Sequence, residues 1–550
     1  MIPHIKKIKV VLFLLYAIVC IDPYTPYVYS AESNFHKWFF VQNNLNNFAE
    51  FLALNDLVLN SKKHGFNGVV LSSKFDLLDI ETTDYISRLK VLKRLCDDQQ
   101  IDLVPCIFSI GYANALLAHD PNMAEGFPVT NVDLKVQGRE ALPKNTESTF
   151  YCDFEAGRSC DLLLENPGQV TFFDNQISHS GSSSLRLENF RYNKHGNARI
   201  VAHLSLKSFS SYIVTFWYRA ADNFNSTLKA QIYTPKGNCV TWREYDRPSA
   251  RWQKAVFEFN SLGDKNLLLY LGVWNGRTGR VWIDDLTIKP QNDLAGMIRR
   301  DGAPLEITNL STGQKYSETT DFVVSEKLPH SGRYFIQIPL QSHIQEGDVL
   351  HISFYRKYEM GNEQTSACMA NPAIYKIWER QIRTIEEVIK PKAYFLSMDE
   401  IRQGGYCGLC RDRNMAELLG ECVTKQVGLI KKYNPNAEIY IWSDMLDPNV
   451  NAVNDYFMVR GNFYGSWRNI SKSIHPVIWV FDNRDRSLVH FKTNGFMPLI
   501  SVCVDGDQAE TIIKSWISSI KNTHDLMGVM YTTWEHDYSQ LEFFSRVFFD

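Results

Sequence analysis

Short apolar runs alternate with amphipathic, helix-like stretches in the first and last parts of this chain, and a long segment without helix signals separates the two parts. Apolar runs that short, placed between amphipathic helices, are typical of a parallel sheet covered by helices. The runs before the interruption are 38–41, 68–71 and 103–108, and those after it are 393–396, 438–442, 477–480, 498–502 and 528–531.

The number of apolar runs indicates the architecture. Three before the interruption and five after it make eight, the number in a closed (β/α)8 barrel. The predicted fold class is α/β, a (β/α)8 TIM barrel interrupted after strand three by a β-sandwich (jelly roll) and a small β-meander. This count requires 349–355 to belong to the insertion. A ninth barrel strand would favour the alternative, a doubly wound open sheet.

The interruption itself is predicted to be rich in β-structure. Between 150 and 290, short strands are spaced by Gly, Ser and Asn turns, which is typical of a sandwich. The predicted divisions are a signal peptide at 1–31, a first barrel part at 32–148, a carbohydrate-binding-like β-sandwich at 149–291, a small β-rich insertion at 292–360 and a second barrel part at 361–550.

The N-terminus has the order of a secretory signal. Lys6, Lys7 and Lys9 precede an apolar run at 10–21, and small residues follow at Ser30 and Ala31. The run is short for a membrane span, which needs about 20 residues, and an uncleaved anchor is the alternative. We therefore expect a secreted, periplasmic or cell-surface protein with no membrane span after signal removal. Its net charge of -3 and lack of a basic patch exclude nucleic acid as a partner.

The 11 cysteines are too few for a disulfide scaffold of this length. Cys152 and Cys160 are close enough in the chain to bridge locally. Cys407 and Cys410 have the C-x-x-C spacing of metal or redox sites. Because zinc needs about four ligands, Cys368 and Cys422 are the plausible additions. A structural disulfide, free thiols and a metal site all stay open for this motif.

Carboxylates are concentrated just after the predicted barrel strands, where the active site of such a barrel lies. Asp399 and Glu400 are adjacent there, and their repulsion raises the pKa of one of them. A protonated acid beside an ionised one is what glycoside cleavage requires. A plain ion-pair cluster with Arg402 is the alternative. Tyr112 and Asn114, after strand three, are further candidates for substrate contact.

A family resemblance rests on these strand ends. Asp399-Glu400, the pair Trp442 and Asp444, and Trp534-Glu535 resemble the catalytic barrel of glycoside hydrolase family 20, the β-N-acetylhexosaminidases. The resemblance implies that Glu400 is the general acid/base and that Asp399 orients the 2-acetamido group. It also implies that Trp442 and Trp534 wall the pocket and that Glu535 binds sugar hydroxyls.

The chain departs from that family in one motif. The usual His-x-Gly-Gly-Asp-Glu is replaced at 395–400 by Phe-Leu-Ser-Met-Asp-Glu. A broader glycosidase relationship would keep Glu400 as the proton donor. It would take the nucleophile or base from Asp505, Asp507 or Glu535, which follow strands seven and eight.

The insertion carries a second resemblance. The fragments 153–155, 180–186, 216–219 and 281–286 resemble the galactose-binding-like sandwich of carbohydrate-binding modules. Trp242, Tyr245 and Trp274 lie in polar, Gly-rich surroundings and are candidates for stacking on sugars. The resemblance also implies a structural calcium, for which Glu155 and Asp285 are suitable oxygen ligands.

The predicted function is a secreted glycoside hydrolase whose partner is a glycan or polysaccharide. The expected substrate contains N-acetylhexosamine, and the expected mechanism is retaining and substrate-assisted, with Glu400 as acid/base and no cofactor. The alternative is a non-catalytic glycan-binding surface protein on a lapsed glycosidase barrel. A polysaccharide lyase or deacetylase has little support, because no His-rich metal motif is visible.

Overall fold

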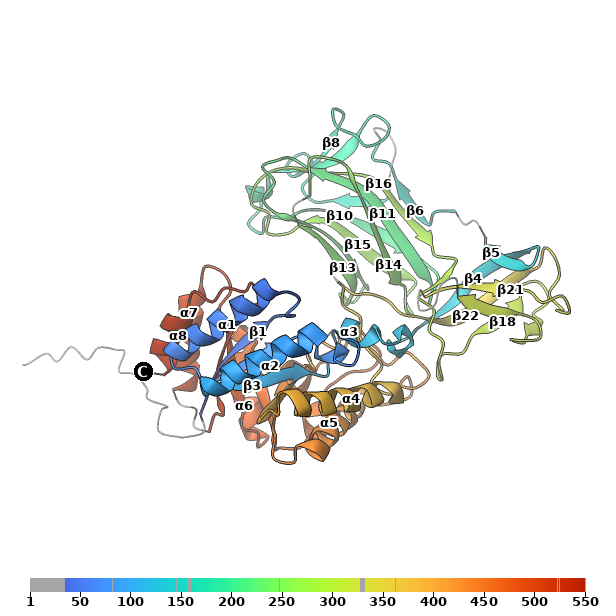
Figure 1. Ribbon diagram of the computed structural model, residues 1–550. Helices are drawn as coiled ribbons and strands as arrows, with labels where there is room; N and C mark the ends of the chain where they lie inside the picture. The colour runs from blue at the N-terminus through green and yellow to red at the C-terminus, as the bar shows by residue number, and fades with distance from the viewer. Residues whose placement is uncertain are drawn as a thin grey trace, which may run out of the picture.

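The computed structural model describes residues 35–81, 83–144, 147–155, 160–246, 248–326, 332–361, 363–521, 523 and 525–549. The predicted signal peptide lies outside these residues. Figure 1 shows a barrel with its surrounding helices, a green β-sandwich beside it and a third sheet next to the sandwich. Among the described residues, no helix has the length and apolar character needed to cross a membrane.

Eight parallel strands form a closed barrel. Strand β29 pairs with β1, where Trp38 lies opposite Met530, and this pairing closes the ring. All five residues of β29 are buried, as expected of a strand with a filled interior on one side and helices on the other. In order around the ring the strands are β1 (His36–Gln42), β2 (Gly68–Ser72), β3 (Asp102–Ile107), β23 (Ala393–Leu396), β25 (Glu438–Trp442), β27 (Ile474–Ile478), β28 (Leu499–Cys503) and β29 (Gly528–Thr532).

Helices surround the barrel and bury one face against it. In the longer ones the sequence explains where they begin: the side chains of Asn371 and Asn414 accept hydrogen bonds from the first free backbone N–H groups of α4 and α5. Pro372 occupies the first position of α4, where a missing N–H costs nothing. The helices are α1 (Phe48–Lys63), α2 (Thr83–Asp98), α3 (Asn114–Leu117), α4 (Pro372–Val388), α5 (Met415–Tyr433), α6 (Arg484–Thr493), α7 (Ala509–Ile520) and α8 (Leu541–Phe548).

The predicted fold class, an α/β (β/α)8 barrel, is wrong. Residues 443–473, between β25 and β27, form no α-helix, only the 3₁₀ turns η4 (Asp444–Leu446) and η5 (Ser466–Arg468) and a two-residue strand. Helix makes up only about 24% of the described residues, and most of their strands lie in antiparallel sheets. Met445, Leu446 and Trp467 in this segment are buried although they lie outside any α-helix.

The sandwich consists of two antiparallel sheets that enclose their own apolar core. Strand β11 shows why these residues form strands, since its buried and less buried side chains alternate along most of its length. One sheet contains, in order, β13 (Cys239–Asp246), β12 (Thr227–Tyr233), β15 (Asn266–Val273), β10 (Ala198–Ser205) and β7 (Leu162–Leu164). The other contains β14 (Gln253–Asn260), β11 (Ser211–Ala220), β16 (Val281–Pro290), β9 (Ser184–Leu187) and β8 (Thr171–Asp174), with β6 (Phe150–Cys152) paired to β16.

A third antiparallel sheet contains strands from both ends of the insertion. Strand β22 pairs with β4 and β18 and is not a barrel strand. The sheet contains β17 (Leu294–Ala295), β21 (Arg333–Gln337), β5 (Glu140–Pro143), β4 (Phe127–Gln137), β22 (Val349–Arg356), β18 (Glu306–Asn309), β19 (Lys315–Tyr316) and β20 (Val323–Glu326). A small parallel pair joins β24 (Gln403–Gly404) to β26 (Met458–Val459).

The chain leaves the barrel and returns to it at one place. Ala124, just before β4, forms an antiparallel bridge with Ala367, just before α4. One hydrogen bond lies on either side of the bridge. The Glu125 N–H donates to the Ser366 carbonyl and the Cys368 N–H donates to the Met123 carbonyl, each at a distance of 2.9 Å. The two antiparallel bodies are therefore held by a pair of neighbouring segments.

Candidate functional site

A cavity of about 540 Å³ opens at the carboxyl ends of the barrel strands. Its wall comes from strand ends and from the loops that follow them, so residues far apart in the sequence meet there. The lining residues are Phe40, Gln42, Ser72, Ser73, Asp76, Cys106, Ile107, Ser109, Tyr112, Ala115, Ser397, Asp399, Glu400, Trp442, Trp479 and Trp534.

The adjacent acids Asp399 and Glu400 both line this cavity. Neighbouring residues on a strand point to opposite faces, but β23 has already ended at Leu396. Glu400 then adopts a left-handed backbone conformation, with φ of 45°. Such a conformation is uncommon for a residue with a side chain and concentrates at functional sites. The turn lets two consecutive carboxyl groups face one space.

Glu400 forms an ion pair with Arg402. Its Oε1 lies 2.5 Å from Nη2 of Arg402, and the hydroxyl of Tyr112 donates a hydrogen bond to its Oε2. The guanidinium also donates to Oε1 of Gln364 and lies 5.0 Å from the ring centres of Trp242 and Phe457. Both oxygens of Glu400 therefore have a partner from the chain.

Asp399 is the group that keeps a proton near neutrality. Burial, followed by the charges of Asp444 and Glu400, raises its pKa to about 7. Burial also raises the pKa of Asp444, to about 6. However, Asp444 accepts hydrogen bonds from the Glu400 N–H at 2.8 Å and from Asn451 Nδ2 at 2.7 Å. These donors favour the ionised form of Asp444, so its pKa is raised less than that of Asp399, which accepts the Ser397 hydroxyl at 3.1 Å.

Aromatic rings form another side of the cavity. The Trp442 ring centre lies 6.1 Å from that of Trp479 and 6.0 Å from that of Trp534, and Phe40 lies 5.4 Å from Trp534. Trp442 is almost fully buried, whereas Trp534 is 38% exposed and has surface left for a ligand. Asp505 holds this rim in place by accepting the Trp534 N–H at 2.8 Å.

The structure brings together part of the predicted site. Asp399, Glu400, Tyr112, Trp442 and Trp534 line the cavity. Four other predicted residues do not line the cavity. Asp444 and Asp505 accept hydrogen bonds from backbone N–H groups of the rim, and Glu535 is exposed beside Asp505. Asn114 donates a hydrogen bond to the Glu363 carbonyl.

Several lining residues were not predicted from the sequence, and Asp76 and Trp479 are the most distinctive of them. Burial raises the pKa of Asp76 to about 7. Asp76 follows the end of β2 by four residues, and Trp479 directly follows β27. Their position after a predicted strand was the available signal. Strand alternation does not determine which side chains of a loop point into the cavity.

The three predicted stacking residues of the sandwich lie in different surroundings. Trp242 packs against Arg402 and Phe457, at the side of the sandwich that meets the barrel loops. Tyr245 packs against Phe216 and Tyr218. Trp274 lies 5.3 Å from the Arg199 guanidinium and lines a separate hollow of about 390 Å³. They do not form a common platform.

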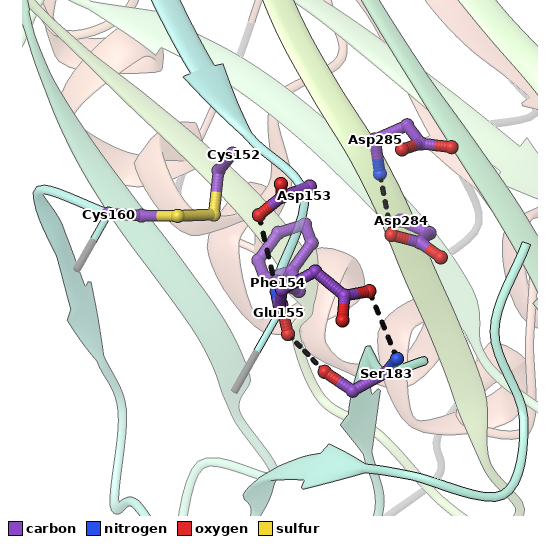
Figure 2. The surroundings of a disulfide bond; sticks show 8 residues. All are labelled: Cys152, Asp153, Phe154, Glu155, Cys160, Ser183, Asp284 and Asp285. Atoms are coloured by element: carbon purple, nitrogen blue, oxygen red, sulfur yellow. Dashed lines mark hydrogen bonds between the residues drawn. A yellow bond between two sulfur atoms is a disulfide. The ribbon is translucent and has the colours of Figure 1, made fainter. Parts of the chain in front are cut away.

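The two carboxylates predicted to hold calcium each have partners from the chain. Glu155 accepts hydrogen bonds from Ser182 and from the Ser183 N–H, as Figure 2 shows for Ser183. Asp285 accepts from His179 Nδ1 and the Ser180 hydroxyl. The calcium stays a prediction. The local bridge between Cys152 and Cys160 is present next to Glu155 (Figure 2).

A larger hollow, of about 790 Å³, lies at the amino ends of the barrel strands. Its main polar contact is the pair His36 and Glu438, 3.0 Å apart, and the hydrogen bond from His36 helps to lower the pKa of Glu438 to about 2. Trp38 at its floor is fully buried and offers no open ring face. The combination of open aromatic faces with a proton-holding acid occurs at the other end of the barrel.

Comparisons with known proteins give structural likeness over about a quarter of the chain. The chain is similar to the CBM22-1 xylan-binding domain of Paenibacillus barcinonensis Xyn10C (14% identity, 26% of this chain and 94% of that one, TM-score 0.22). It is also similar to the C-terminal family 22 carbohydrate-binding module of Clostridium thermocellum Xyn10B, with 14% identity, 27% of this chain and 97% of that chain covered and a TM-score of 0.20. A third similar structure is TmCBM61 in complex with β-1,4-galactotriose, with 12% identity, 24% of this chain and 87% of that chain covered and a TM-score of 0.19. At these scores the likeness transfers no ligand to this chain.

No protein-family model matches the chain, and no curated protein matches it. The predicted resemblance to glycoside hydrolase family 20 is therefore not shown by either comparison.

Proposed function

We propose that this protein binds a carbohydrate in the cavity at the carboxyl ends of its barrel strands. The observation that carries the proposal is the presence of three tryptophans and an acid pair around one cavity. A sugar ring has an apolar face that packs on an aromatic ring, and hydroxyl groups at its edge that need hydrogen-bond partners. The cavity offers both kinds of surface.

The polar side of the cavity suits sugar hydroxyls. Gln42, Ser72, Ser73 and Ser109 line it, and these side chains can both donate and accept hydrogen bonds. A volume of about 540 Å³ lies within the range of small-ligand pockets. The expected ligand is therefore a short glycan or the end of a longer one.

Hydrolysis of a glycosidic bond is a second candidate function, and one observation favours it. Burial and neighbouring charges raise the pKa of Asp399 to about 7, and Asp399 and Glu400 both line the cavity. In this proposal the Asp399 proton passes to the glycosidic oxygen as the bond from that oxygen to the anomeric carbon breaks. Water then supplies the hydroxyl group of that carbon, and its remaining proton returns to the Asp399 carboxylate. These roles differ from the family 20 resemblance, which implies Glu400 as the acid.

Binding is the first candidate because both oxygens of the Glu400 carboxylate already have a partner from the chain. Arg402 occupies Oε1 and Tyr112 occupies Oε2. A carboxylate that attacks or stabilises an anomeric carbon must present an oxygen to it, and the ion pair with Arg402 opposes this. The alternative function, glycan binding on a barrel without turnover, agrees with this arrangement.

The binding proposal is tested with the purified full chain on a glycan array, followed by calorimetric titration of the strongest ligand. Trp479→Ala is expected to weaken binding by about tenfold, since stacking on an aromatic face contributes about 1 kcal/mol or more. Trp274→Ala, at the separate hollow on the sandwich, is the matched control and is expected to bind normally. Loss of binding in Trp274→Ala alone would place the ligand on the sandwich and contradict the proposal.

The two candidate functions are separated by turnover. The wild type and Asp399→Asn are incubated with aryl glycosides of the sugar that binds. Release of the aryl group by the wild type, with a loss of about a hundredfold or more in Asp399→Asn, would support hydrolysis. A bound ligand that the wild type leaves intact would leave glycan binding as the function.

A further inference from the structure

Three cysteines and a glutamate meet where the chain leaves the barrel and returns to it. The sulfur atoms of Cys368, Cys407 and Cys410 and a carboxylate oxygen of Glu125 all lie within 4.8 Å of one another. All four residues are buried. Glu125 precedes β4, Cys368 precedes α4, and the other two belong to the C-x-x-C motif between β24 and α5. The fold thus brings three separate segments to one point.

Three distances within this cluster lie close to the separation of ligands around one metal ion: one falls within that range and two are slightly shorter. The Cys407 sulfur lies 3.2 Å from that of Cys410 and 3.5 Å from that of Cys368, and the Cys410 sulfur lies 3.2 Å from Oε1 of Glu125. Bonded sulfur atoms of a disulfide are about 2.05 Å apart. Sulfur and oxygen ligands of one tetrahedral zinc ion are about 3.4–3.8 Å apart, given metal–ligand lengths of about 2.0–2.3 Å.

We infer that this cluster is a structural zinc site, with Cys368, Cys407 and Cys410 as thiolate ligands and Glu125 as the fourth ligand. Four ligands from the protein complete a tetrahedral shell and leave no open position, which is typical of structural zinc. Thiolates favour zinc over the hard cations magnesium and calcium. On binding, the thiols release their protons to water and no group is oxidised or reduced.

A disulfide explains the cluster less well than a metal ion does. Only two of the three cysteines can pair, which would leave a thiol and the Glu125 carboxylate buried together. A buried carboxylate is costly without a counter-charge. Arg300 lies beside the Cys407 sulfur and supplies one positive charge. In the zinc-bound state, Arg300 and the zinc ion together supply three positive charges against the four negative charges of three thiolates and a carboxylate.

Surrounding contacts hold the ligands in position. Oε1 of Glu125 accepts hydrogen bonds from the N–H groups of Tyr406 and Cys407, each at 2.9 Å. The N–H of Gly408, inside the C-x-x-C motif, donates to the Gly302 carbonyl at 2.7 Å. Outer contacts of this kind orient metal ligands and are part of a metal site.

The site would join the insertion to the loop that carries the acid pair. Glu125 and Cys368 flank the bridge between Ala124 and Ala367. Cys407 follows the loop of Glu400 and β24, where Gln403 accepts the Ser366 N–H at 2.9 Å. A zinc ion here cross-links these segments and stabilises the rim of the cavity without contacting a ligand in it. The inference does not depend on the proposed function.

The first test is the metal content of the purified full chain, measured by mass spectrometry of the elements after dialysis. About one zinc per chain is expected in the wild type. Cys407→Ser and Cys410→Ser are expected to lose it, while Cys422→Ser, a buried cysteine outside the cluster, should keep it. A wild type without zinc, or a Cys407→Ser variant that retains it, would overturn the inference.

A second test uses only the wild type, because the cysteine variants can fail to fold. Cobalt is exchanged for zinc, and the expected spectrum has a thiolate-to-cobalt charge-transfer band with the visible bands of tetrahedral cobalt. A chelator should lower the unfolding temperature, and zinc but not magnesium should restore it. Thiols are then titrated in denaturant with chelator and without reductant. A Cys407–Cys410 disulfide would remove two thiols and leave no zinc, which contradicts the inference.

Discussion

Gly111 lies directly against the backbone of Asp399. A Cβ atom at Gly111 would be 2.3 Å from the Asp399 carbonyl oxygen and 2.9 Å from that of Glu400. Because both contacts involve backbone atoms, no side-chain rotation can relieve them. The loop after β3 therefore sets the position of the acid pair after β23.

Gly111→Ala is expected to displace the acid pair and weaken glycan binding. Forcing a methyl group into a filled space costs about 1–3 kcal/mol of folding free energy. Denaturant unfolding and calorimetric titration measure the two effects. Gly428→Ala on α5 is the matched control: nothing lies within 4 Å of its Cβ position, so it should gain about 0.5–1 kcal/mol. Unchanged binding in Gly111→Ala would show that this contact does not position the acids.

The raised pKa of Asp399 makes stability depend on pH. Its pKa is about 7 in the folded chain and 3.8 ordinarily, so the folded state binds this proton more tightly than the unfolded state does. The contribution of Asp399 to the free energy of unfolding should therefore fall as the pH rises from about 4 to 7. In Asp399→Asn, the free energy of unfolding should fall less steeply with pH, by about the slope that one bound proton contributes.

Denaturant unfolding at a series of pH values measures this slope. Asp507→Asn, an exposed acid in the loop after β28, is the control and should keep the slope of the wild type. A parallel pH dependence in Asp399→Asn and the wild type would mean that Asp399 is ionised throughout the range.

Trp534 should contribute to ligand affinity through its exposed ring face. Trp534→Ala removes the ring that packs on Phe40 and Trp442, and a loss of about tenfold in affinity is expected. Trp534→Phe should recover part of it, since an aromatic face is kept. Calorimetric titration gives both values. Phe48→Ala, which removes an exposed ring on α1, should have no effect on affinity.

The disulfide between Cys152 and Cys160 should stabilise the sandwich. It closes a short loop next to β6, and loop closure of that size contributes about 2–3 kcal/mol. The double variant Cys152→Ser/Cys160→Ser should unfold at a lower temperature in calorimetry. Reductant added to the wild type should produce the same shift. If the variant responds to reductant as strongly as the wild type does, the shift has another origin.

The barrel strands were predictable because each is buried on both sides. An apolar run such as 498–502 has no polar alternation, and the structure places β28 there with four of its five residues buried. The lack of an α-helix before β27 was not predictable. Met445 and Trp467 are apolar because loop segments cover the barrel at that point, and composition does not separate this from a helix.

The acid pair and two of the tryptophans were predictable from their position after strands, whereas the partners of Glu400 were not. Arg402 appeared as a possible ion-pair partner, but its contact with Trp242 depends on how the sandwich meets the barrel. The cysteine cluster shows the same limit. The C-x-x-C spacing was visible, while Glu125 joins it only through the pairing of segments around Ala124 and Ala367.

The adjacency of Ala124 and Ala367 has a consequence for the order of assembly. Strands β3 and β23 are neighbours in the ring although the whole insertion separates them along the chain. Bringing such distant segments together early carries a large loop-closure entropy. Once the inserted sheets have formed, their two ends already lie side by side, and the loop to be closed shortens to residues 108–123 on one side and 368–392 on the other. The barrel is then expected to close last, after the inserted sheets have brought the segments around Ala124 and Ala367 together.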